Sequence, residues 1–168
     1  MAHITLQGIS LETVGSLPSV GSKAPAFSLT NTDLANVGLE AFKGRKILNI
    51  VPSLDTGVCA ASARRFNLEA TSLSNTTIIN VSADLPFAAK RFCTAEGINK
   101  VVSLSSFRSP NFGKDYGVTI LSGPLTGLLA RSIVVLNTKN EVVYTELVPE
   151  IGHEPDYKNA LEALKKAE

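Results

Sequence analysis

The sequence predicts an α/β fold in which a mixed β-sheet is flanked by helices. The chain has 168 residues, the usual size of one domain, so we expect a single domain over residues 1–168. Its middle part alternates short β-branched runs with helical periodicity, which is typical of parallel βαβ units. Its last part holds two apolar runs around a polar turn, followed by an amphipathic segment. This order indicates parallel strands joined to an antiparallel hairpin and a closing helix.

The N-terminal segment predicts a small hairpin within residues 1–15. Apolar residues alternate on both sides of Gln7 and Gly8, which are suited to a turn. The next segment, Gly15 to Pro25, is rich in glycine, serine and proline and predicts a linker. We therefore expect the main body of the domain to begin near Phe27.

The first βα unit of the main body is predicted from Ile47 onward. Ile47–Val51 has the composition of a strand covered on both faces, and Pro52 ends it. An amphipathic helix follows, because apolar residues recur at helical spacing on one stripe. The members of this stripe are Cys59, Ala63, Phe66, Ala70 and Leu73. The pattern places Cys59 in the first turn of the helix.

A second βα unit, again a strand followed by a helix, is predicted after the first. Thr77–Ser82 predicts a strand, and Asp84-Leu85-Pro86 is typical of a helix start at which the aspartate caps backbone N–H groups. The helix is expected to run through about Ala95 and to end before Gly97, with Cys93 in its last turn.

The remaining elements complete the predicted sheet. Val101–Ser105 is a third strand and Asn111–Tyr116 a single helical turn. Ala130–Leu136 and Glu141–Val148 form a hairpin, and Pro155–Lys166 is a closing helix. A mixed sheet in this order is most commonly a thioredoxin-like fold, although a fold alone does not define chemistry.

Composition excludes several classes of function. Lys and Arg number 16 and Asp and Glu 15, so charge gives no reason to expect binding to nucleic acid or to an anionic membrane. The sequence has no membrane-length apolar run, and its start resembles no secretory signal, so we predict a cytoplasmic location. Two cysteines are too few for a structural disulfide framework. If the two cysteines form a disulfide, we expect that disulfide to take part in a reaction rather than to stabilise the fold.

The turn before Cys59 carries the strongest chemical signal. A cysteine in the first turn of a helix lies at the positive end of the helix dipole, which favours the thiolate. Pro52 and Gly57 shape the turn, and Thr56 brings a hydroxyl close to the sulfur that can donate to the thiolate or contact a substrate. The alternative is that Cys59 is a small buried apolar residue of the helix stripe. The compound signal favours the functional interpretation.

Cys93 and Arg131 leave more room for interpretation. Cys93 taken alone carries no signal, and pairing with Cys59 would require one helix end to unwind, because the two lie on separate helices. Arg131 stands at the start of an apolar strand, where an ionised side chain is costly unless it is paired or faces a cleft. It is either a surface arginine or a group that stabilises a thiolate and a substrate oxygen.

Four other protein classes can be compared with the pattern. Cys59 and Arg65 have the Cys-x5-Arg spacing of cysteine phosphatases, but the residues between them are helix formers rather than the glycines of a phosphate loop. A thioredoxin-type disulfide oxidoreductase would need a cysteine where Thr56 stands, and a Cys–His hydrolase has only His153 as a base. A thioredoxin-like binding module without activity is the fourth alternative.

The motif Pro52-x-x-x-Thr56-x-x-Cys59 matches the active-site signature of peroxiredoxins. With Ser82-Ala83-Asp84-Leu85-Pro86-Phe87 and Arg91-Phe92-Cys93, the chain resembles the bacterial thiol peroxidases, which are atypical two-cysteine peroxiredoxins. The resemblance extends over nearly the whole chain, through Gly127–Arg131 to Glu154–Tyr157.

This resemblance implies a role for each signature residue. Cys59 is expected to attack a hydroperoxide and become a sulfenic acid, and Cys93 to resolve it as an intramolecular disulfide. Thr56 and Arg131 would hold the peroxide and the thiolate, and Pro52 would shield the sulfur. The resemblance further implies reduction by thioredoxin, a homodimer and a role in antioxidant defence. Neither a cofactor nor a metal is expected, since His3 and His153 lack ligand spacing.

Overall fold

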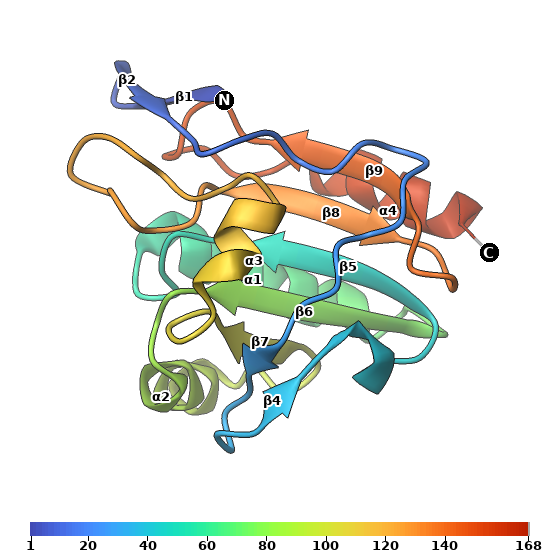
Figure 1. Ribbon diagram of the computed structural model, residues 1–168. Coiled ribbons are helices and arrows are strands. Elements are labelled where there is room, and N and C mark those ends of the chain that lie inside the picture. The colour runs from blue at the N-terminus through green and yellow to red at the C-terminus, as the bar shows by residue number, and fades with distance from the viewer. Residues whose placement is uncertain (168) are drawn as a thin grey trace.

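The computed structural model describes residues 1–167, and Figure 1 shows its path from the N-terminus to the C-terminus. The strands are β1 (His3–Leu6), β2 (Ile9–Glu12), β3 (Leu29–Thr30), β4 (Asn36–Val37), β5 (Arg45–Ile50), β6 (Thr76–Ser82), β7 (Val102–Ser105), β8 (Ser132–Leu136) and β9 (Val142–Leu147). The helices are the 3-10 helix η1 (Leu39–Ala41) and the α-helices α1 (Gly57–Ala70), α2 (Pro86–Glu96), α3 (Pro110–Asp115) and α4 (Tyr157–Lys166).

Seven strands form one mixed sheet in the order β4-β3-β7-β6-β5-β8-β9. The centre consists of β7, β6 and β5 in parallel, and β8 lies antiparallel to β5. Helices α1, α2 and α4 pack on one face, and α3 lies on the other, which faces the viewer in Figure 1. The predicted mixed sheet flanked by helices is therefore confirmed.

The central strands are apolar on both sides because each face of the sheet is covered. All residues of β8 are buried, and every residue of β5 after Arg45 is buried as well. One core lies between the sheet and the α3 side, and a second lies beneath α1 and α4. This burial fixes the end of β5 firmly, and the turn to Cys59 leaves from that end.

The sequence prediction missed two strands. β3 and β4 have two residues each and pair with each other at the edge of the sheet, and β3 also pairs with β7. A strand of two residues shows no alternation, so periodicity does not reveal it. The predicted hairpin after Ala130 is present as β8 and β9, and the closing helix begins at Tyr157, after the N-cap Asp156.

The N-terminal hairpin is attached to the main body through Glu150. Its turn residues Gln7 and Gly8 both have positive φ, as expected for a tight hairpin turn. The Glu150 carboxylate accepts hydrogen bonds from the Thr5 hydroxyl and from the backbone N–H groups of Gln7 and Gly8. These bonds, that of Thr5 first, lower the pKa of Glu150 to about 2. The hairpin thus lies beside the loop that follows β9.

Candidate active site

Cys59 lies in the first turn of α1, as the helix stripe predicted. Its side chain has no exposed surface, and it packs in an apolar cluster with Val51, Leu54 and Ala63. The N-cap residue Thr56 makes no side-chain cap, so no hydroxyl occupies the N–H groups of this turn. The sulfur therefore lies in a dry environment at the positive end of the helix dipole.

Pro52 and Thr56 flank the turn that leads to Cys59. Pro52 lies two residues after Ile50, the last residue of β5, and is itself buried. Thr56 is exposed, and its hydroxyl donates to the carbonyl oxygen of Ser53 at 3.2 Å. The threonine hydroxyl thus stabilises the turn in this arrangement.

Arg131 is buried, contrary to the alternative of a surface arginine. Only 2% of it is exposed, and its Nε donates to the carbonyl oxygen of Ile151 at 3.0 Å. Ser132 pairs with Ile50 across the β5–β8 ladder, so Arg131 lies one step further, level with Val51. Nη1 of Arg131 is buried without a hydrogen-bond partner in the described structure. A buried cationic donor thus stands unsatisfied at the end of the sheet from which the Cys59 turn leaves.

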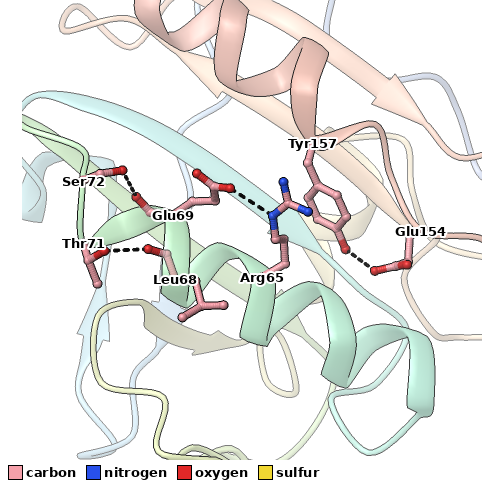
Figure 2. A network of polar contacts seen from close by, with 7 residues as sticks. All are labelled: Arg65, Leu68, Glu69, Thr71, Ser72, Glu154 and Tyr157. Atoms are coloured by element: carbon pink, nitrogen blue, oxygen red, sulfur yellow. Dashed lines mark hydrogen bonds and ion pairs between the residues drawn. The ribbon is translucent and has the colours of Figure 1, made fainter.

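Tyr157 of α4 lies close to two arginines on this side of the sheet. Burial, together with a hydrogen bond to Glu154, raises the pKa of Tyr157, while the charges of Arg131 and Arg65 act in the opposite direction. Figure 2 shows the Arg65 guanidinium next to the Tyr157 ring, at 5.0 Å from its centroid, with its Nε on Glu69. The Tyr157 phenol stays neutral at ordinary pH, and α4 is held against α1.

Cys93 lies in the last turn of α2, as predicted, but in a different environment. It is partly exposed and borders a groove of about 530 Å³ between α2 and the edge of the sheet. Its sulfur is 3.4 Å from the hydroxyl of Ser103 on β7. The helix ends at Gly97, which has a φ of 65° in the left-handed region that favours glycine.

The two sulfurs belong to one apolar cluster without being bonded. Both cysteines are free thiols, and Cys93 packs against the buried group that contains Cys59 and Ala89. Each remains within a regular helix. The structure brings the two predicted cysteines to the same packing unit of α1 and α2.

A buried polar network supports α1 from below, and the sequence analysis did not identify it. Nδ2 of Asn49 donates to the hydroxyl of Ser62 at 3.3 Å and to Oδ1 of Asn80 at 3.0 Å. The Ser62 hydroxyl donates to the carbonyl oxygen of Cys59 at 2.9 Å. An asparagine in the middle of each of two apolar strands was the available signal, because a buried amide needs partners.

The predicted capping role of Asp84 is wrong. The N-cap residue of α2 is Leu85, and no side chain caps this helix. The Asp84 carboxylate instead accepts hydrogen bonds from the Ser53 hydroxyl and the Leu54 backbone N–H, both at 2.7 Å. The turn before Cys59 lies close enough to Asp84 to donate these hydrogen bonds. The sequence around Asp84 does not reveal this contact, because the turn is distant in the chain.

The geometry argues against two of the alternative classes. Residues 60–64, which would have to wrap a phosphate, are regular helix, and Arg65 is engaged with Glu69 and Tyr157. His153 is exposed, as expected of a solvated loop residue.

Within residues 1–167, no helix is long and apolar enough to cross a membrane.

Comparisons with known proteins define the family. The Redoxin family model matches residues 19–161. The thiol peroxidases of Mycobacterium bovis and Mycobacterium tuberculosis are 56% identical over 165 residues, which is 98% of this chain and 99% of theirs. The crystal structure of a peroxiredoxin-like protein from Aquifex aeolicus superposes with a TM-score of 0.92 at 35% identity, covering 99% of this chain and 97% of that one. A thiol peroxidase from Chromobacterium violaceum shares the fold, with a TM-score of 0.90 at 23% identity over 98% of this chain and 95% of that one.

The chain therefore belongs to the redoxin family. Its place in that family is among the thiol peroxidases, so it is a peroxidase with a peroxide substrate and a thiol reductant. The thioredoxin-like fold and the resemblance to bacterial thiol peroxidases, both expected from the sequence, are confirmed.

Proposed function

We propose that this peroxidase reduces hydrogen peroxide and organic hydroperoxides through Cys59. The Cys59 thiolate attacks the terminal oxygen of the peroxide, so that an S–O bond forms as the O–O bond breaks. The leaving oxygen departs as an alcohol, or as water, once it is protonated. Cys59 is thereby oxidised to a sulfenic acid and the peroxide is reduced.

The observation that carries this proposal is that a buried arginine lies at the end of the sheet from which the turn to a buried first-turn cysteine leaves. Arg131 has a guanidinium nitrogen without a partner, level with the end of β5. In a dry site such a donor stabilises negative charge that develops on an oxygen in the transition state. The 56% identity to proteins called thiol peroxidase supports the same chemistry.

Pro52 and Thr56 have supporting roles in this proposal. The buried ring of Pro52 keeps water from the side of the sulfur next to β5. The Thr56 hydroxyl is exposed at the mouth of the turn, and it exchanges its bond with Ser53 for a peroxide oxygen or the thiolate. The hydrogen bond from Thr56 to the peroxide or the thiolate forms only at short distance, so it depends on the shape of the turn.

Cys93 completes the reaction as the resolving cysteine. Its sulfur attacks the sulfur of oxidised Cys59, an S–S bond forms, and the sulfenic oxygen leaves as water. The shared apolar cluster supports this step, because it places both cysteines in one packing unit of α1 and α2. A helix end must unwind for the bond to form, since both residues stand within regular helix. A second thiol also prevents further oxidation of Cys59.

The cycle closes with an external reductant. We propose that the dithiol of thioredoxin reduces the Cys59–Cys93 disulfide by thiol–disulfide exchange and becomes a disulfide itself. In the same proposal the protein is a homodimer that serves antioxidant defence in the bacterial cytoplasm. Reduction by thioredoxin, the homodimer and the role in antioxidant defence rest on the resemblance to the thiol peroxidases.

Two cysteine variants test the proposal. Cys59→Ser is expected to abolish peroxide consumption, whereas Cys93→Ser keeps the first oxidation and blocks recycling by thioredoxin. The measurement is intact mass and free-thiol count before and after one equivalent of cumene hydroperoxide. Wild-type protein should lose both thiols and two hydrogens and recover both with thioredoxin. Equal loss of the first step in the two variants, or two unreacted thiols in the wild type, would contradict it.

A further inference from the structure

We propose that Asp84 is a positioning residue that holds the turn before Cys59 in the geometry required for peroxide reduction. This inference rests on the proposed role of Cys59 and extends it to a residue that touches neither sulfur nor substrate. Asp84 lies in the loop between β6 and α2, 25 positions after Cys59 in the sequence. Its side chain nevertheless bonds to the segment that leads into α1.

Both oxygens of the Asp84 carboxylate are used. Oδ1 accepts from the Ser53 hydroxyl at 2.7 Å, and Oδ2 accepts from the Leu54 N–H at 2.7 Å and from the Ser82 hydroxyl at 2.8 Å. No Lys or Arg of the described chain forms an ion pair with Asp84. The carboxylate is therefore stabilised by neutral donors alone, and two of the three come from the turn before Cys59.

Asp84 is itself held by the sheet. The Ser82 hydroxyl that binds its carboxylate belongs to the last residue of β6, and the Ser105 hydroxyl of β7 donates to its carbonyl oxygen at 2.5 Å. Ser82 and Ser105 are almost fully buried. Asp84 is thus a fixed support, and the turn is the part that is attached to it.

The contacts continue from Asp84 towards α1. The Ser53 hydroxyl accepts from the Asp55 N–H at 3.2 Å, and the Ser53 carbonyl accepts from the Thr56 hydroxyl at 3.2 Å. Thr56 is the N-cap residue of the helix, and its carbonyl accepts from the Ala60 N–H at 2.8 Å. In the described chain Asp84 is the only side chain from another segment that hydrogen bonds to residues 53–56.

This arrangement makes the position of the turn depend on one carboxylate. Without it, the Ser53 hydroxyl and the Leu54 N–H lose their partners, and the turn is free to shift relative to the sheet that carries Arg131. Displacement of reacting groups by about 1 Å can slow a reaction by about 10²-fold. Because the buried Cys59 and the polar network under α1 stay in place, we expect a loss of about tenfold, at the smaller end of such positioning effects.

The test isolates the first oxidation step in the Cys93→Ser background. The protein has no tryptophan, so the reaction is followed by rapid mixing with peroxide and quenching into a reagent that traps sulfenic acids, with intact mass as the readout. The variants are Asp84→Ala, Asp84→Asn, Ser53→Ala and the double variant that combines Asp84→Ala with Ser53→Ala. Asp55→Asn is the matched control, because Asp55 is an exposed carboxylate in the same turn whose side chain makes no hydrogen bond in the described structure.

The expected result has three parts. Asp84→Ala lowers the rate constant for Cys59 oxidation about tenfold at full amplitude, and Asp84→Asn recovers part of the loss because one amide oxygen can still accept from Leu54. Ser53→Ala slows the step, but adds little on top of Asp84→Ala, since the two act through one bond. Asp55→Asn reacts at the rate of the parent protein.

Several outcomes would overturn the inference. A parental rate constant in Asp84→Ala would do so, and so would a reduced amplitude with an unchanged rate constant, which signals partial unfolding alone. If the fold-reductions in rate of Asp84→Ala and Ser53→Ala multiply in the double variant, the two residues do not act through one hydrogen bond. If Asp84→Ala does not fold, an unchanged rate in Ser53→Ala overturns it. Failure of the parent protein to oxidise Cys59 would instead refute the proposed function.

Discussion

The surroundings of Cys59 and Cys93 differ in almost every physical respect. Cys59 is completely buried at the N-terminal end of a helix, whereas Cys93 is partly exposed near the C-terminal end of another. The helix dipole therefore favours negative charge on the first sulfur and disfavours it on the second. This difference agrees with the proposed division of roles, in which Cys59 attacks the peroxide and Cys93 attacks oxidised Cys59.

The two helix ends also differ in how firmly they are held. The first turn of α1 is fixed by Ser62 on the Cys59 carbonyl, by Asn49 beneath it and by the turn bonded to Asp84. The last turn of α2 borders a groove, and Ser103 gives the Cys93 sulfur a single polar contact. In the proposed cycle, the bonds around Cys59 hold the geometry of peroxide attack, and the groove beside Cys93 leaves space for the movement that brings the sulfurs together.

The largest effect expected from this comparison concerns Arg131. Arg131→Ala should slow oxidation of Cys59 by about 10²–10³-fold, as removal of a single oxyanion donor does, because the leaving oxygen loses its cationic partner. Disulfide formation, measured after the sulfenic acid has formed, should be unaffected. Quenched-flow thiol counting in the wild-type background separates the two steps.

Arg131→Lys is the matched variant for this prediction. Lysine keeps the charge but loses the planar fork that lets Nε bind Ile151 while Nη1 stays free, so an intermediate rate is expected. Thermal unfolding of both variants provides the control for loss of structure. A peroxide rate equal to that of the wild type, or equal slowing of both steps, would contradict the assignment.

The sequence predicted those parts of the molecule that depend on local patterns. The helix stripe placed Cys59 in a first turn, and Gly97 marked the end of the helix that carries Cys93, both as observed. The strands β5, β6 and β8 are long apolar runs, and their predicted positions agree with the structure to within two residues. The sequence left Arg131 open between a surface arginine and a group that faces a cleft, and the structure shows that it is buried.

The features that sequence analysis missed depend on contacts between distant segments. Asp84 looks like a helix cap in the sequence, and only the approach of Ser53 and Leu54 gives it another use. Asn49 and Asn80 meet because β5 and β6 are adjacent in register, which one strand alone does not reveal. The roles of the signature residues in the reaction remain predictions, because geometry alone does not measure a rate.

Two glycines test which helix end moves when the disulfide forms. Gly57 is the first residue of α1 and has open space around it, so Gly57→Ala should stabilise the first turn by about 0.5–1 kcal/mol. If unwinding of this turn precedes disulfide formation, that step should slow about two- to fivefold, by the usual relation between free energy and rate. Oxidation of Cys59 should keep its rate.

Gly97→Ala is the opposite change at the other helix. At a φ of 65° alanine is strained, and the variant loosens the last turn of α2 by about 1 kcal/mol, so disulfide formation should speed up or keep its rate. The measurement for both variants is the rate at which the second thiol disappears after a single addition of peroxide. A slower disulfide step in Gly57→Ala with an unchanged one in Gly97→Ala would identify the first turn of α1 as the end that unwinds. A faster step in Gly97→Ala with an unchanged one in Gly57→Ala would identify the last turn of α2 instead.

The smallest effect is expected at Ser103, the polar contact of the Cys93 sulfur. Ser103 is 7% exposed, and its hydroxyl lies 3.4 Å from Sγ, where it can donate to the sulfur when Cys93 loses its proton and becomes the attacking thiolate. A single hydrogen bond of this kind contributes about 0.5–1 kcal/mol, so Ser103→Ala should slow disulfide formation about two- to fivefold. We expect a value near the lower end of this range.

Thr94→Ala is the matched control for Ser103→Ala. Thr94 is next to Cys93 on α2, but its hydroxyl is exposed and donates to the Lys90 carbonyl rather than to the sulfur. Disulfide formation in this variant should keep the wild-type rate, and neither variant should change oxidation of Cys59. If Ser103→Ala instead slowed the peroxide step, the two cysteine environments would be coupled through β7, which carries both Ser103 and the Ser105 that supports Asp84.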